Sequence, residues 1–305
     1  MIFQLKILGN NSAIPAHDRN QTSQLLQLDR QYVLIDCGEG TQMQLSKQNI
    51  KLGRIRTVLI SHLHGDHYFG LIGLISTMHL FHRKHTLTIF APPELEKILE
   101  LQLKASETCL CFTIKFVPLS HEGTKEIYSE EQFSINAFPL EHGIKCYGFL
   151  IRENPKQYRI NKENLPDNML IQEIITLKSG KNVLQDNGTI KYALGDYTHP
   201  PRSMRSYAYC SDTSYNEDII PYVKNVDLLY HEATFGDEME DRAALTQHST
   251  ATQAATIAKK AGAKKLLLGH YSTRYKELNP LLEEARKIFE ETYLTVEGET
   301  ITLNE

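Results

Sequence analysis

The chain has 305 residues, of which 41% are hydrophobic and 23% charged, a composition that indicates a globular protein with room for a sizeable core. Its formal net charge of −4 argues against a surface that is basic all over, so a nucleic-acid partner would have to bind a local patch. The N-terminus turns polar too soon for a signal peptide and no run of about 18 apolar residues follows, so we expect a cytoplasmic protein without a membrane segment.

The N-terminal part of the chain predicts the beginning of a sheet. Short strands are expected at Phe3–Leu8, Gln24–Leu28 and Tyr32–Asp36. The third strand leads into a glycine turn at 37–40, which precedes an amphipathic helix that ends at about Lys47. At the strand end, Asp36 either hydrogen-bonds the outer nitrogen of a metal-bound histidine or orders its own turn, and the sequence leaves both readings open.

Three imidazoles and a carboxylate follow closely after residues 57–60, an apolar run that predicts a buried strand. They are His62, His64, Asp66 and His67. In extended backbone the first three point to the same side, and the last begins an apolar segment, 68–81, long enough for a helix that places it beside the others. Four ligands this close would crowd one ion, so the spacing favours two ions that share them. The alternative is a helix cap at Asp66 with solvated histidines in a loop.

Strands and helices continue to alternate through the rest of the chain outside residues 152–205. Strands are predicted at 86–91, 112–119, 133–140, 207–210, 228–230, 264–269 and 293–296. Helices are predicted at 92–105, at 280–289, and from a cap at Ser249 or Thr250 to Ala261. Strand ends repeatedly carry polar residues, as expected when a site lies along one rim of packed sheets: Asp36, His62, His142, Asp212, Glu232 and His270.

Residues 152–205 differ from their surroundings. Four prolines interrupt the segment, its hydrophobic periodicity is weak, and Asp186-Asn187-Gly188 predicts a hairpin turn. It contains nine basic and six acidic residues, an excess of positive charge in a chain whose total is negative. This pattern predicts either a surface that contacts nucleic-acid phosphates or a solvated insertion with an ordinary scatter of lysines.

Short motifs stand at residues 12–15, 19–23, 36–42, 61–67, 146–149, 231–234 and 248–250. Together they resemble the motifs of the ribonuclease Z family, within the metallo-β-lactamase superfamily. One position departs from the family pattern: His17 stands where the family's P-x-K-x-R-N loop has lysine. In the family this loop is associated with sensing the 3′ end of tRNA.

The resemblance implies a fold and a metal centre. The implied fold is α/β, a metallo-β-lactamase-like four-layer αβ/βα sandwich of residues 1–305 with an inserted arm at 152–205. The implied cofactors are two Zn²⁺ ions per subunit, with Mn²⁺ or Fe as alternative occupants. The implied ligands are His62, His64 and His142 for one ion, Asp66, His67 and His270 for the other, and Asp212 as a bridge.

The resemblance also implies an activity. A metal-activated hydroxide would attack a phosphodiester and remove the 3′ trailer from precursor tRNA, leaving a 3′-hydroxyl on the tRNA. Asp66 would accept the proton of the attacking water, and His248, oriented by Glu232, would donate a proton to the leaving oxygen. The alternative is that His248 is an ordinary helix N-terminal residue and Glu232 a buried structural contact.

The implied partners are precursor tRNA and a second copy of the chain in a homodimer. In the family, the inserted arm clasps the tRNA elbow. The apolar run 71–75 suits either a dimer interface or the core. The substrate contacts that we expect are Arg19, Asn20, Lys156, Arg159, Lys162, Lys178, Lys181 and Lys191.

Two other functions fit parts of the sequence. A small-molecule phosphodiesterase or aryl sulfatase on the same scaffold would use all seven ligands but leave residues 152–205 and the motif at 248–250 without a role. A metal-loaded RNA-binding or scaffold protein is the non-catalytic alternative, and it would predict losses from the ligand set, which are absent from this sequence.

Overall fold

Residues 2–304 are described by a computed structural model, in which the chain divides into two compact units. The larger unit comprises residues 2–152 and 205–304, and the smaller one comprises residues 153–204. The smaller unit coincides to within one residue at each end with the segment that the sequence sets apart. Within residues 2–304, no helix has both the length and the apolar character needed to cross a bilayer.

The first sheet of the larger unit has seven strands in the order β18-β1-β2-β3-β4-β5-β6. Strands β1 to β3 are antiparallel neighbours, whereas β3 to β6 are parallel and therefore need crossovers, which run through helices. The strands are β1 (Phe3–Gly9), β2 (Ser23–Leu28), β3 (Gln31–Ile35), β4 (Ile55–Leu59), β5 (Leu87–Ala91), β6 (Ile114–Pro118) and β18 (Thr300–Thr302). The helices are α1 (Thr41–Lys47), α2 (Gly65–Tyr68), α3 (Leu71–Leu80) and α4 (Glu94–Ala105).

The second sheet also has seven strands, in the order β17-β16-β15-β14-β9-β8-β7. Its parallel strands, β14 to β17, again alternate with helices. The strands are β7 (Lys125–Ser129), β8 (Phe133–Leu140), β9 (Cys146–Glu153), β14 (Ser206–Cys210), β15 (Leu228–Glu232), β16 (Leu266–Gly269) and β17 (Thr292–Leu294). The helices are α7 (Glu240–Thr246), α8 (Ala251–Ala261) and α9 (Asn279–Ile288).

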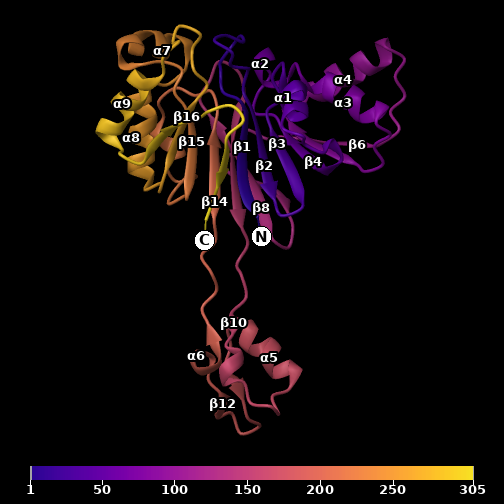
Figure 1. The fold of residues 1–305 in the computed structure, drawn as a ribbon, viewed down its shortest axis with the longest axis vertical. Coiled ribbons are helices and arrows are strands. Elements are labelled where there is room, and N and C mark those ends of the chain that lie inside the picture. Colours follow the sequence, from indigo (N-terminus) through magenta and orange to yellow (C-terminus); the bar gives the residue numbers. More distant parts are fainter. Residues whose placement is uncertain (1, 305) are drawn as a thin grey trace. The chain divides into compact units, whose positions relative to one another are not determined.

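Three buried apolar clusters separate the layers of the larger unit. One fills the space between the two sheets, where Phe3 and Leu5 meet Tyr209 and Tyr230. A second joins the first sheet to α1, α3 and α4, and a third joins the second sheet to α8 and α9. Figure 1 shows the two sheets with their helices on the outer faces. The predicted four-layer αβ/βα sandwich is therefore confirmed.

The helix predicted at 68–81 is wrong in one respect, because the chain forms two helices there, α2 and α3. The carbonyl of His67 accepts a hydrogen bond of 2.7 Å from the backbone of Cys37 and so leaves the helical pattern. At Gly70 the backbone approaches the same turn so closely that a Cβ atom would lie 2.3 Å from the carbonyl of Gly38. The break anchors His67 against the turn that follows β3.

Several other elements differ from the sequence pattern. Thr250, not Ser249, caps α8, with a capping box that Gln253 completes. The sequence did not predict α7, β7, β9 or β18. β9 is apolar on nearly all positions and lies inside a sheet, so it lacks the alternation that marks a half-buried strand.

The smaller unit contains short elements around few buried residues. Strand β10 (Arg159–Ile160) pairs with β13 (Thr198–His199), and β11 (Val183–Leu184) pairs with β12 (Ile190–Tyr192). The predicted hairpin turn joins the second pair and is confirmed: Gln185 donates a backbone hydrogen bond of 2.8 Å to Thr189. The helices are α5 (Ile171–Lys178) and α6 (Leu194–Tyr197).

Candidate metal centre

The seven candidate metal ligands lie together, although they come from four separate parts of the chain. Each part leaves a strand of one of the two sheets at the same rim. His62 and His64 follow β4, and α2 then carries Asp66 and His67; His142 follows β8, Asp212 follows β14 and His270 follows β16.

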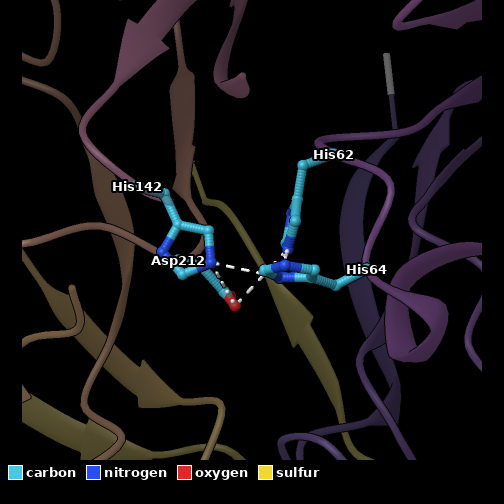
Figure 2. Close-up of side chains that lie close together, drawn as sticks. All are labelled: His62, His64, His142 and Asp212. Atoms are coloured by element: carbon cyan, nitrogen blue, oxygen red, sulfur yellow. Dashed lines mark hydrogen bonds and ion pairs between the residues drawn. The ribbon is translucent and has the colours of Figure 1, made fainter. Parts of the chain in front are cut away.

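Three histidines and one carboxylate form the first cluster, which Figure 2 shows converging on one point. Nδ1 of His64 lies 3.1 Å from Nε2 of both His62 and His142. Oδ2 of Asp212 lies 3.5 Å and 3.8 Å from the same two Nε2 atoms. Metal bonds of about 2.0–2.2 Å in a tetrahedral site place neighbouring ligand atoms about 3.3–3.6 Å apart, so these four atoms fit around one ion.

The second cluster comprises Asp66, His67 and His270, and it shares Asp212 with the first. Oδ2 of Asp66 lies 3.4 Å from Nε2 of His67 and 3.5 Å from Nε2 of His270. Oδ1 of Asp212 lies 3.4 Å and 3.1 Å from the same nitrogens. Asp212 therefore presents one carboxylate oxygen to each cluster, which is how a carboxylate bridges two ions.

Two buried nitrogen atoms of the second cluster have no hydrogen-bond partner among residues 2–304: Nε2 of His67 and Nε2 of His270. A buried polar atom left unpaired costs about 1–3 kcal/mol, and folded proteins rarely leave one so. Both atoms face the carboxylates of Asp66 and Asp212. A cation between them would bind both nitrogens and the two carboxylates, so the residues fit a metal ion.

The charges around the clusters also favour cations. Burial lowers the pKa of His62 well below its usual range, so this imidazole is neutral, as a ligand must be. Burial has the same effect on His67, but three nearby carboxylates, Asp212, Asp66 and Asp36, outweigh it and hold the pKa of His67 well above its usual range. Without ions, a proton on His67 balances part of this negative charge, and a bound cation would take its place.

Asp36 is fully buried and accepts hydrogen bonds from four donors. Ser61 donates its backbone N–H and its hydroxyl at 2.7 and 2.8 Å, Nδ1 of His67 lies at 2.8 Å, and the hydroxyl of Tyr209 donates at 2.7 Å. Because the Ser61 hydroxyl donates to Asp36, it accepts from Nδ1 of His62, 3.0 Å away. Asp36 therefore turns Nε2 of both histidines toward the clusters, which supports the first of the two readings of Asp36.

Glu232, on the second sheet, orients imidazoles as Asp36 does on the first. It is fully buried and accepts three backbone N–H groups, the hydroxyl of Thr234 at 2.7 Å and Nδ1 of His248 at 2.9 Å. Because the Thr234 hydroxyl donates to Glu232, it accepts from Nδ1 of His270, 2.9 Å away. One carboxylate thus orients a candidate ligand and the candidate proton donor. The sequence analysis did not predict that Ser61 and Thr234 orient histidines. Only their positions inside the motifs at 61–67 and 231–234 could have indicated it.

Three residues at the rim adopt left-handed backbone conformations: Asp36 (φ 54°), Gln247 (φ 54°) and His270 (φ 60°). This conformation costs about 1–3 kcal/mol for a residue other than glycine and is frequent at functional sites. The carbonyl of Gln247 lies 2.9 Å from Nδ1 of His142 and so orients that imidazole. Two of these positions, Asp36 and Gln247, therefore carry groups that orient candidate ligands, and the third, His270, is itself a candidate ligand.

A cavity of about 690 Å³ opens over the clusters. The residues that line it include Asp66, Asp212, His248 and His270. The exposed side chains of Arg242 and Arg274 and the ring of Phe69 also line it, and the sequence analysis had not singled them out. Two guanidinium groups beside a metal centre favour a substrate that carries phosphate.

The predicted substrate contacts in the larger unit are held by other parts of the chain. The Arg19 guanidinium donates to the side chain of Asn11 at 3.1 Å and to the carbonyl of Lys276 at 3.3 Å. The Asn20 side chain donates to Glu297 at 2.9 Å. These bonds fix the loop that carries both residues, and their contact with substrate stays a prediction.

In the smaller unit the predicted contacts divide into two groups. Lys156 pairs with Glu153 at 3.0 Å, Lys191 pairs with Glu173 at 2.6 Å, and Nε of Arg159 donates to the carbonyl of Pro200 at 3.4 Å. The remaining side chains are exposed: Lys162, Lys178 and Lys181. Their role in binding substrate also stays a prediction.

The hydrogen bonds of Asp36 predict how metal affinity responds to substitution. Asp36→Asn removes the acceptor that orients both His67 and His62, so we expect both ions to bind about 10–100-fold more weakly. Ser61→Ala interrupts only the path to His62, so one of the two ions should be affected. Competition with a chromophoric chelator measures both affinities.

A suitable control is Ser76→Ala, which deletes a hydroxyl that bonds only to its own helix on α3. If Ser61→Ala and Ser76→Ala bind metal equally well, Ser61 does not orient a ligand.

Comparison with known proteins gives a consistent result. The sequence model of the family described as Anti-Pycsar protein Apyc1 matches residues 3–189. A protein named Ribonuclease Z from Cytophaga hutchinsonii is 48% identical over 305 residues, which cover 100% of this chain and 97% of that protein. A second Ribonuclease Z, from Bacteroides thetaiotaomicron, is 40% identical and covers 99% of this chain and 96% of its own length.

Solved structures share the fold over nearly the whole chain. The short form of human tRNase Z superposes with a TM-score of 0.72 at 27% identity and covers 99% of this chain and 100% of its own. YhfI from Bacillus subtilis, a metallo-β-lactamase fold protein, has a TM-score of 0.71 at 20% identity with the same coverage. The chain therefore belongs to the ribonuclease Z family and shares its fold with the metallo-β-lactamase fold protein YhfI.

Proposed function

We propose that the chain is a metal-dependent endoribonuclease that removes the 3′ trailer from precursor tRNA and leaves a 3′-hydroxyl on the tRNA. The observation that carries this proposal is the 2.9 Å contact between His248 and Glu232, beside two clusters of metal ligands. Relatives named Ribonuclease Z that match the whole chain support it. A small-molecule phosphodiesterase that releases an acidic alcohol such as a phenol would use the clusters but would need no proton donor.

We propose two Zn²⁺ ions per subunit, because five imidazoles and two carboxylates suit zinc better than Mn²⁺ or Fe, the alternative occupants. His62, His64 and His142 would hold one ion, Asp66, His67 and His270 the other, and Asp212 both. When bound, the ions would lower the pKa of a water and offset negative charge on the reacting phosphate.

Two side chains of this protein would move protons in the reaction. Burial raises the pKa of Asp66, but the charge of His67 outweighs it and holds this pKa below its usual range, so the carboxylate is ionised and can accept the proton of the attacking water. Burial lowers the pKa of His248, but the charge of Glu232 outweighs it and raises this pKa to about 9. His248 is therefore protonated at neutral pH and faces the cavity, where it can donate to a leaving ribose oxygen.

The smaller unit would bind the body of the tRNA. The exposed Lys162, Lys178 and Lys181 support this role, because phosphate contacts supply most of the affinity for nucleic acid. Three further side chains would contact phosphates once they release their present partners: Lys156, Arg159 and Lys191. In the larger unit, Arg19 and Asn20 would contact the tRNA end near the cavity.

We further propose a homodimer in the cytoplasm, where precursor tRNA is processed. Leu71, Leu74 and Ile75 of the apolar run are buried in the core, so they provide no interface themselves. Beside them, a groove of about 620 Å³ carries the exposed side chains of Met43 (65%) and Phe69 (59%). Exposed apolar side chains in one groove favour an interface with another protein.

Removal of the proton donor should affect substrates according to their leaving groups. His248→Ala should lower kcat for precursor tRNA by about 10²–10⁴-fold, because a ribose oxygen leaves poorly without a proton. Hydrolysis of an aryl phosphodiester, whose leaving group departs as a stable anion, should fall by less than about tenfold. Steady-state kinetics on both substrates measure the difference.

Asp66→Ala is the comparison, and it should abolish both reactions. Equal losses on the two substrates in His248→Ala would exclude His248 as the proton donor.

Loss of charge from the smaller unit should weaken tRNA binding alone. Replacing Lys162, Lys178 and Lys181 with Gln should raise KM for precursor tRNA about tenfold and reduce the slope of affinity against salt by about three, because each phosphate contact contributes about one. The aryl phosphodiester should react as before. The control is the same triple change at three exposed lysines of the larger unit, Lys97, Lys104 and Lys115. If the two triple variants raise KM for precursor tRNA equally, the smaller unit does not bind the tRNA.

The groove predicts an oligomeric state that sedimentation can measure. The 34.9 kDa chain should sediment as a dimer, and Met43→Glu should sediment as a monomer because it buries a charge in the interface. Leu101→Glu, at an apolar position of α4 that is 68% exposed, should remain dimeric. A wild-type monomer at micromolar concentration would contradict the proposal.

A further inference from the structure

A second polar cavity of the larger unit lies at the opposite ends of the strands that lead to the metal clusters. Its volume is about 430 Å³, within the usual range of about 300–1,000 Å³ for small-molecule sites. The turn between β2 and β3, the first residues of β4 and β5, and the last residues of β7 line it. None of these residues takes part in the metal centre.

One side chain reaches this cavity because β4 has an extra residue there. Tyr32 pairs with Ile55 and the next residue, Val33, pairs with Thr57, so Arg56 is left without a partner in the ladder. Adjacent residues of a regular strand point to opposite faces, yet Arg56 and Thr57 both line the cavity. Bulges of this kind redirect side chains and are frequent at functional sites.

A second guanidinium at the cavity is fixed in position. Arg54 stacks on the ring of Tyr32 at 4.3 Å and donates to the hydroxyl of the same residue at 3.0 Å. It also donates to the carbonyl of Arg30 at 3.1 Å and to that of Asp29 at 3.4 Å. These bonds leave other N–H donors of Arg54 available to a ligand.

Two guanidinium groups at this cavity form no ion pair with a carboxylate of residues 2–304. The side chains of Arg30 and of half-buried Arg56 form no hydrogen bond or ion pair with any residue in the range 2–304. Behind them, the buried Arg83 donates to backbone carbonyls such as that of Ile55, at 2.8 Å. Burial, together with the neighbouring charge of Arg56, lowers the pKa of Arg83 to about 10. Nearby cations of this kind attract an anion.

The cavity also contains groups that would recognise more than a simple anion. Thr57, Thr86 and Thr88 are among the residues that line it, and so is Glu130. Glu130 accepts a hydrogen bond from the side chain of Gln31 at 2.7 Å and another from the hydroxyl of Tyr128. A carboxylate held this way accepts from ligand hydroxyl or amino groups.

We propose that this cavity binds a free phosphorylated small molecule of the size of a nucleoside monophosphate. Its phosphate faces the guanidinium groups of Arg30, Arg54 and Arg56, whose planar forks match phosphate oxygens, and its hydroxyl or amino groups face the side with Glu130. A free ligand fits better than an RNA strand, because a strand needs a continuous basic surface and the carboxylate repels its backbone.

Calorimetric titration of the holoenzyme with adenosine 5′-monophosphate tests this site. We expect binding with a Kd below about 1 mM, weakened about tenfold in Arg56→Gln and in Arg30→Gln, since a charge-assisted hydrogen bond is worth about that factor. Arg30 is exposed, so its variant keeps the test valid if Arg56→Gln folds poorly. Lys97→Gln removes one charge from an exposed position of α4 and should bind the nucleotide like wild type.

Competition locates the bound nucleotide. Adenosine 5′-monophosphate in the proposed cavity should not compete with an aryl phosphodiester at the metal centre at concentrations near its Kd. The proposal is overturned if Arg56→Gln and Arg30→Gln bind like Lys97→Gln, or if the nucleotide's Kd equals its inhibition constant against the aryl substrate. Displacement of the nucleotide by a short single-stranded oligoribonucleotide, weakened in Arg56→Gln, would make the cavity a contact for RNA and would also overturn it.

Discussion

The arrangement of the site depends on one requirement of imidazole chemistry. A histidine that presents an unprotonated nitrogen to a cation has to direct its other ring nitrogen outward as a hydrogen-bond donor. The structure meets this requirement for three candidate ligands, His62, His67 and His270, with two buried carboxylates, Asp36 and Glu232. Each contacts one imidazole directly and a second one through a hydroxyl, Ser61 or Thr234.

These two carboxylates also explain why the site needs both sheets. A buried carboxylate is costly unless its oxygens are fully hydrogen-bonded, and both carboxylates have four or more donors. Asp36 follows β3 of the first sheet, yet one of its donors is the hydroxyl of Tyr209 on β14 of the second. The packing between the sheets and the orientation of the candidate ligands therefore support each other.

The sequence predicted those features that local pattern determines. Strand ends rich in polar residues marked the rim, and the contiguous motif at 61–67 marked His62, His64, Asp66 and His67. Features that depend on contacts between distant segments were not predictable. The helix break at Gly70 arises from the turn after β3, and the roles of Ser61 and Thr234 depend on carboxylates elsewhere in the chain. The register shift that brings Arg56 to the second cavity depends on pairing with β3.

Glu232 differs from Asp36 in what it connects. Asp36 orients two candidate ligands, one in each cluster, whereas Glu232 orients the candidate ligand His270 and the candidate proton donor His248. The separation between the proton donor and the clusters is consequently fixed by one carboxylate. A side chain that has to protonate a leaving oxygen gains most from such a fixed position, because small misplacements of a catalytic group cost large factors in rate. The buried hydrogen bonds of Glu232 thus connect a candidate metal ligand to the candidate proton donor.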